Sequence, residues 1–130
     1  MTLEAELRTY TLAGVAVAAL IGTRMHARVL PQTPTLPAVV YQRIDTRRLH
    51  VMAGPDGLPM ARMQLTCWGS TPAVAYTVAE AVRERLDGTA GTWGALTIGA
   101  CLCVGERDMD DPDANRSGLA LDFAIQYQEV

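Results

Sequence analysis

Oxygen-bearing side chains recur near the C-terminus at the spacing of a calcium-binding loop. They fall at positions 1, 3, 5, 7 and 12 of the EF-hand template and are Asp111, Asp113, Asn115, Ser117 and Asp122. That template surrounds one Ca²⁺ ion with hard oxygen ligands. Arg116 occupies the position where the sharp turn needs glycine, Pro112 stiffens the segment, and no helix follows. The sequence therefore favours a solvated acidic loop, and no metal site is predicted.

Other polar residues lack the spacing of a catalytic or ligand set. His26 and His50 have no histidine, glutamate or cysteine partner at a metal-binding interval. Ser70 follows a glycine but lies outside the GxSxG pattern of a nucleophile elbow. Three glycines after the central helix do not match GxGxxG and are interpreted as turn residues: Gly88, Gly91 and Gly94. We therefore predict no catalytic residue and no bound cofactor.

Composition excludes several kinds of enzyme. Every basic side chain apart from histidine is arginine. Without lysine, the chain has no Walker A phosphate loop, no Schiff base and no lysine general base. The three cysteines lie in apolar, strand-like runs, and Cys101 and Cys103 are poorly placed for a disulfide along one extended strand. With Cys67, they are predicted to be reduced residues in or near the core.

Size and charge predict one domain, residues 1–130, with 49% hydrophobic residues around one core. Residues 106–117 contain five acids and two arginines, which account for the whole net charge of −3. The rest of the chain is balanced, so a basic footprint for tight nucleic-acid binding is lacking. The apolar run at 12–21 is too short to span a bilayer and follows Glu4 and Glu6, so we expect cytoplasmic synthesis without membrane association.

A strand followed by a helix is the clearest structural pattern. Apolar and polar residues alternate from Ala61 to Cys67, which predicts a strand with one buried face. Thr71 can cap the free N–H groups of a helix, Pro72 suits the first helical position, and Gly88 suits a left-handed stop. The apolar side of this helix is expected to consist of Val74, Val78, Ala81, Val82 and Leu86. An amphipathic helix therefore packs on a sheet.

The remaining patterns predict an α+β domain. Thr2 can cap a first helix, Gly14 interrupts it, and a second short helical stretch ends at Gly22. Extended segments are expected at 24–30, 38–45, 96–104 and 119–127, with a hairpin arm over 47–60 whose tip is Gly54-Pro55-Asp56-Gly57. A polar loop is expected between the last two strands. The predicted fold is a single α+β domain with a mostly antiparallel sheet, helices on one face and a projecting β-hairpin arm.

Three side chains do not fit the simple pattern of a buried and a solvated face. Trp68 falls on the polar side of its strand, so another element such as the N-terminal helix covers it, a partner covers it, or it stays partly exposed. Tyr76 falls on the charged side of the central helix. Arg85 falls on the apolar side, where its stem can lie on apolar surface while its charge meets the negative helix end.

Four runs together resemble a known family. They are LPAVVYQRID, QLTCWGST, AVRERLDG and LALDFAIQYQE, in that order along the chain. Their order and spacing resemble the small tail completion or tail terminator proteins of long-tailed bacteriophages, over nearly the whole chain. This resemblance implies assembly rather than catalysis. It implies a structural protein of the virion that forms a ring, usually a hexamer, caps the tail tube and joins the tail to the neck of the head.

The resemblance also implies partners. These are further copies of the chain, the tail tube protein and a neck or head-completion protein, while DNA passes through the ring without specific binding. The expected contact elements are the arm at 46–60 and the acidic segment at 106–117. Interface residues are expected to be Arg47, Arg48, Trp68, Tyr76, Asp108, Asp110, Asp111 and Asp113.

Two other functions stay open at this point. A neck or head-closure adaptor of the same particle would use the same kind of surfaces. A small-ligand-binding or hydrolytic α+β domain would use Asp111, Asp113 and a histidine, and would need a concave pocket in which polar groups converge.

Overall fold

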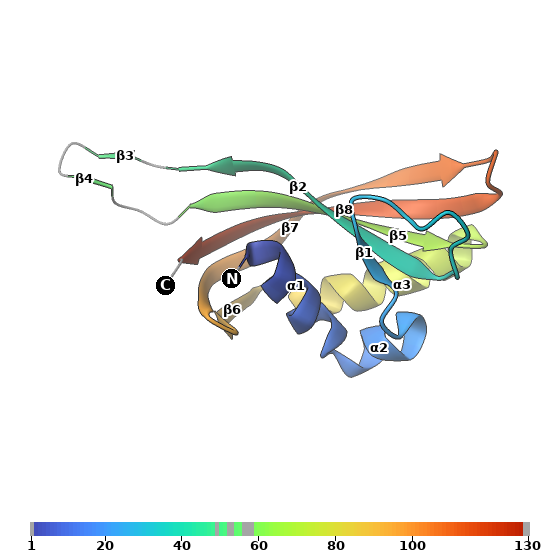
Figure 1. The fold of residues 1–130 in the computed structure, drawn as a ribbon, viewed down its shortest axis with the longest axis horizontal. Coiled ribbons are helices and arrows are strands. Elements are labelled where there is room, and N and C mark those ends of the chain that lie inside the picture. The colour runs from blue at the N-terminus through green and yellow to red at the C-terminus, as the bar shows by residue number, and fades with distance from the viewer. Residues whose placement is uncertain (1, 49, 52–53, 56–58, 129–130) are drawn as a thin grey trace.

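The computed structural model describes residues 2–48, 50–51, 54–55 and 59–128. Its helices are α1 (Leu3–Leu12), α2 (Val15–Ile21) and α3 (Pro72–Leu86). Its strands are β1 (Met25–Ala27), β2 (Ala38–Arg47), β3 (His50–Val51), β4 (Gly54–Pro55), β5 (Met60–Gly69), β6 (Thr89–Trp93), β7 (Leu96–Asp111) and β8 (Arg116–Gln128). Figure 1 shows a long twisted sheet with the helices gathered against one side.

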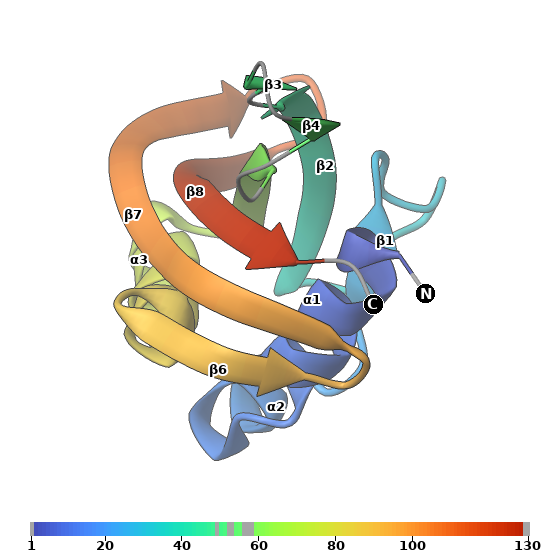
Figure 2. The same ribbon diagram turned by 90° about the vertical axis from the view of Figure 1, so that its left-hand side faces the viewer.

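Six strands form one sheet in the order β1-β2-β5-β8-β7-β6. β1 and β2 are parallel, and the other neighbouring pairs of this sheet are antiparallel. The sheet curls, with β7 and β6 wrapping around toward the helices (Figure 2). The predicted α+β class, the mostly antiparallel sheet and the helices on one face are confirmed. We call the face that carries the helices the helix side and the opposite face the open face.

The central strand and helix form for the reasons that the sequence indicates. The Thr71 side chain accepts a hydrogen bond of 3.3 Å from the backbone N–H of Val74, and Pro72 begins α3. Gly88 ends the segment with φ of 78°, a left-handed conformation that costs glycine little. These local signals define where α3 begins and ends before any tertiary contact is considered.

The N-terminal helices also follow their predicted boundaries. The Thr2 hydroxyl accepts a hydrogen bond from the Ala5 N–H at the start of α1. Gly14 separates α1 from α2, and Gly22 ends α2 with φ of 60°. Of the helices described, none is long and apolar enough to cross a membrane.

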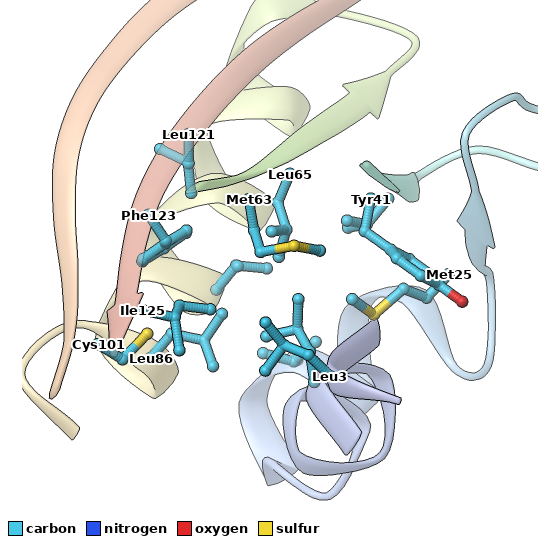
Figure 3. Close-up of a cluster of buried hydrophobic side chains, with 14 of the residues drawn as sticks. Leu3, Met25, Tyr41, Met63, Leu65, Leu86, Cys101, Leu121, Phe123 and Ile125 are labelled. Atoms are coloured by element: carbon cyan, nitrogen blue, oxygen red, sulfur yellow. The ribbon is translucent and has the colours of Figure 1, made fainter. Parts of the chain in front are cut away.

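The core lies between the helix side of the sheet and the helices (Figure 3). Met63 and Leu65 from β5 and Phe123 and Ile125 from β8 point toward Leu86 of α3, and all five are fully buried. Alternation along each strand directs every second side chain to this layer. Each such side chain stabilises the fold by about 1.5–3 kcal/mol relative to an exposed position.

The predicted acidic loop at 106–117 is largely strand, so that prediction is wrong. β7 continues to Asp111 and β8 begins at Arg116, with only residues 112–115 in the turn. Asn115 in that turn has φ of 54°, a conformation that asparagine tolerates better than most residues. The carboxylates extend as a strand because residues 116–121 of β8 offer a continuous antiparallel partner.

Strand β6 was absent from the sequence prediction. It pairs with the start of β7 through a bulge near Gly91, which lies within the strand at φ of 120° and is therefore not a turn residue. Glycine in a strand commonly marks such a bulge. Gly94, at φ of 61°, does lie in the turn between β6 and β7.

The region of the predicted arm contains a short antiparallel ladder. β3 pairs with β4, and both lie beyond the ends of β2 and β5 (Figure 1). Within the predicted tip, Asp56 and Gly57 lie outside the described residues. The projecting hairpin arm therefore stays a prediction.

Candidate functional site

The side chains at the end of β7 alternate between the two faces of the sheet. Glu106 and Asp108 lie on the helix side, because their partners on β8 are Leu121 and Leu119, whose side chains face the helices. Asp110 lies two residues further along β7 and therefore on the same side. The open face carries Arg107, Met109 and Asp111. The residues that the sequence analysis treated as one acidic loop therefore form two rows, a carboxylate row beside α3 and a row of mixed charge on the open face.

Two contacts join the carboxylate row to α3. The Tyr76 hydroxyl donates a hydrogen bond of 2.8 Å to Asp108 Oδ1, and Arg83 Nε lies 3.6 Å from Glu106 Oε1. These residues and Glu80 line a polar groove of about 450 Å³ between α3 and β7. The hydrogen bond to Asp108 and its negative charge raise the pKa of Tyr76, so the hydroxyl remains a donor at neutral pH.

Trp68 lies on the open face, and the prediction that the N-terminal helix covers it is wrong. Its neighbours along β5, Met63, Leu65 and Cys67, face the helices, whereas Trp68 faces the opposite way. The Arg116 guanidinium lies 5.2 Å from the centre of the Trp68 ring, within the range of a cation–π contact.

A glycine makes room for the Trp68 ring. A Cβ atom at Gly118 would lie 2.8 Å from Trp68 Cε3 and 2.6 Å from the Met109 carbonyl oxygen. Trp68 is therefore half-buried against β8, and its remaining surface lines a hollow on the open face together with Arg28 and Val29.

The oxygen ligands of the calcium template do not converge. Asp122 is 6% exposed and lies on the open face, where Arg62 and Arg107 approach its Oδ2 at 3.3 and 3.6 Å. Asp111 instead forms an ion pair of 3.1 Å with Arg116. Across the described parts of the chain, no group of three or more histidine, cysteine, aspartate or glutamate residues is placed to hold a metal ion.

Arg85 has an intrachain role. Its Nε donates a hydrogen bond of 3.0 Å to the Tyr10 carbonyl oxygen, and its guanidinium lies 3.8 Å from the centre of the Tyr10 ring. The other face of that ring stacks on Trp93 at 4.7 Å. Arg85 thereby connects the end of α1 to α3, which explains a cation on the apolar side of the helix.

The remaining predicted interface residues lie apart from one another. Arg47 is exposed at the end of β2, and Arg48 follows it and is also exposed. Asp113 is exposed in the turn between β7 and β8, at the opposite end of the sheet (Figure 1). The structure brings Tyr76 and Asp108 together and leaves these two ends separate.

Sequence reasoning missed two arginines that form ion pairs with the acidic residues of β7. Arg83 and Arg116 hold carboxylates of β7, yet neither was among the expected interface residues. The alternation of charges from Glu106 to Asp111 was the available signal, since period two indicates a strand.

The buried cysteine thiols are expected to make the free energy of unfolding depend on pH in the alkaline range. Burial raises the pKa of Cys67 far above its usual range and that of Cys101 to about 12. Above about pH 9 the unfolded chain loses these protons while the folded protein keeps them, so stability falls as pH rises. Between pH 9 and 11 we expect a loss of about 1.4 kcal/mol per pH unit for each thiol.

Urea unfolding under reducing conditions at several pH values measures this slope. Cys67→Ala should make the slope shallower by one thiol's share, about 1.4 kcal/mol per pH unit. Equal slopes in the variant and the parent would show that Cys67 ionises without unfolding. A thiol this resistant to ionisation is also a poor nucleophile.

A comparison with protein families gives the decisive observation. The model of the family described as "Tail completion protein gp17" matches residues 5–128. The chain belongs to this family. It is a structural protein of the bacteriophage tail and belongs to the tail and neck region of the virion. The expected resemblance is confirmed.

A solved structure has the same fold. A chain of the "Virion of native gene transfer agent (GTA) particle" superposes with a TM-score of 0.80 at 18% identity, covering 96% of this chain and 93% of the other. At that identity the match shows a shared fold. No curated protein matches the chain.

Proposed function

We propose that the protein forms a closed ring that caps the tail tube and joins the tail to the neck of the head. The observation that carries this proposal is the family match over residues 5–128, which includes the helix layer and both ends of the sheet. A small domain reaches such a role by repeating one heterologous contact until the ring closes.

The shape of the molecule supports a geometric mechanism. The sheet is longer than its helix layer, so the β7–β8 turn and the end of β2 extend beyond the core in opposite directions (Figure 1). Exposed surfaces at two opposite ends allow one protein to contact the tail tube at one end and the neck at the other. Further copies of the chain, the tail tube protein and a neck protein are the proposed partners.

The open face suits a surface past which DNA moves. Arg62 and Arg107 both approach Asp122, and Arg116 approaches Asp111. Arginines paired in this way present less free positive charge to phosphate groups than unpaired ones. Passage of DNA without specific binding is therefore compatible with this face lining the ring.

We also propose that the protein has no catalytic activity. The histidine-based hydrolytic alternative needs converging polar groups, but Asp111 lies on the open face of β7 while His26 lies on β1 at the edge of the sheet. The polar groove beside Tyr76 contains ion pairs and hydrogen bonds rather than an activated nucleophile.

Native mass spectrometry of the pure protein and electron microscopy of assembled tails test the ring. We expect a closed oligomer in solution or at the end of the tail tube, because heterologous contacts close into rings. A monomer in solution that is also a single copy per virion would contradict the proposal. Elemental analysis is a further check, since a stoichiometric metal would favour the rival functions.

A further inference from the structure

Besides the short outermost strands β1 and β6, two longer strand segments of the main sheet pair on one side only among the described residues. β6 pairs with β7 up to Cys101, and beyond it β8 is the one strand neighbour of β7 among the described residues. β1 pairs with β2 up to Tyr41. Beyond Tyr41, β5 is the one strand neighbour of β2 among the described residues. The free segments are therefore 105–111 of β7 and 42–47 of β2.

Each free segment exposes backbone groups that can pair with another strand. The fold already closes the beginning of the β7 edge, because Asp87 Oδ1 accepts a hydrogen bond of 2.9 Å from the Cys103 N–H. The Gly88 N–H likewise donates to the Cys101 carbonyl oxygen at 2.7 Å. Residues 105–111 follow this closed part.

The two edges carry opposite charge. Residues 105–111 contain four carboxylates and one arginine, and residues 42–47 contain two arginines and one aspartate. On the helix side, Glu106, Asp108 and Asp110 of β7 would meet Arg43 of β2, which forms an ion pair of 2.6 Å with Glu4 of its own copy. Repulsion among the carboxylates disfavours pairing of the β7 edge with the same edge of another copy. Opposite charges favour pairing of one edge with the other, and such complementarity also steers association.

We propose that residues 105–111 of β7 in one copy pair with residues 42–47 of β2 in the next, so that the sheet continues from copy to copy. This interface deepens the ring proposed above and rests on it. The strand directions permit the join, because three antiparallel steps separate β2 from β7. The new pair is therefore antiparallel when the sheets of neighbouring copies face the same way.

The positions of the two edges agree with closure into a ring. Asp45 aligns through β5 and β8 with Leu102 of β7, whereas the free β7 segment is centred near Asp108. This offset is about 20 Å along the strands, and four strand spacings across amount to about 19 Å. Pairing the edges therefore requires strands tilted by about 45° to the ring axis, at the upper end of the tilt usual in closed sheets.

The groove beside α3 supports the same occupant. Glu106 and Asp108 line it next to the free edge, and Glu80 lines its other wall. Side chains on the helix side of an incoming strand would lie over these carboxylates. Arg83 also lines the groove, and Arg43 is the arginine of residues 42–47 that faces the helix side and would meet these carboxylates.

Charge reversal at each edge tests the proposed pairing. Asp110→Arg changes the helix side of the β7 edge, and Arg43→Glu changes the helix side of the β2 edge. Each variant should raise the dissociation constant of the ring at least about tenfold, because like charges would then face each other. The double variant should recover most of this loss. Glu84→Arg on the exposed side of α3 is the matched control for Asp110→Arg and should assemble like the parent.

The oligomer is measured by native mass spectrometry over a dilution series, and as copies per tail if the free protein is monomeric. Circular dichroism confirms that each variant is folded. If the parent forms rings and both single variants assemble equally well, the edge pairing is wrong and the ring stands. A double variant as defective as the single ones would also overturn the pairing. A parent that forms no ring, free or on tails, contradicts the proposed function itself.

Discussion

Replacing Phe123 by alanine is expected to lower the free energy of unfolding by about 3–5 kcal/mol. Phe123 is fully buried on β8, between Met63 of β5 and Cys103 of β7. Truncation removes the transfer energy of the ring and leaves a cavity that the flanking strands cannot close. Because a small domain is stable by only about 5–15 kcal/mol, this variant should approach the limit of folding.

Urea unfolding followed by circular dichroism measures the effect, with Leu102→Ala as the control. Leu102 lies on the adjacent strand and is 49% exposed, so its truncation should change stability by no more than about 0.5 kcal/mol. Equal losses in the two variants would show that the layer between the sheet and α3 is not the main core.

Local chemistry explains which parts of the fold could be predicted. The strand at 61–67, the cap at Thr71 and the stop at Gly88 depend on residues close in sequence, and the structure places all three as expected. The position of the core could also be predicted, because alternation in strands and helical spacing specify which face of each element is apolar.

Pairing across the sheet explains what could not be predicted. Acidic residues have low strand propensity, so the segment at 106–111 was expected to be a loop. Its pairing with residues 116–121 supplies hydrogen bonds that local propensity does not register. β6 was missed for a related reason, since Gly91 weakens the local pattern and only pairing with β7 reveals the strand.

The candidate surfaces show the same limit. The Tyr76 to Asp108 hydrogen bond joins residues 32 positions apart, and the contact of Arg116 with Trp68 depends on β8 lying beside β5. Sequence reasoning named Tyr76, Asp108 and Trp68 as expected interface residues but could not supply their partners. The two free edges became visible only when the lengths of β1 and β6 were known.

Neutralising the acidic end of the sheet should impair assembly far more than folding. The variant changes Asp108, Asp110, Asp111 and Asp113 to asparagine. Its contacts with Tyr76 and Arg116 lie near the surface, and exposed ion pairs contribute at most about 1 kcal/mol each, so the melting temperature should change little. Infectious yield and head–tail joining should fall at least about tenfold, because the negative edge is lost.

Plaque titres and electron microscopy of free heads and tails measure this effect, with Glu84→Gln on the exposed side of α3 as a control. Asparagine keeps the size of each side chain and one acceptor oxygen, so a defect in the folded variant reports the lost charge rather than a change of shape. If the variant unfolds, the four carboxylates stabilise the β7–β8 hairpin. If it folds, assembles and infects like the parent, the acidic end is solvated surface and its proposed role in joining is wrong.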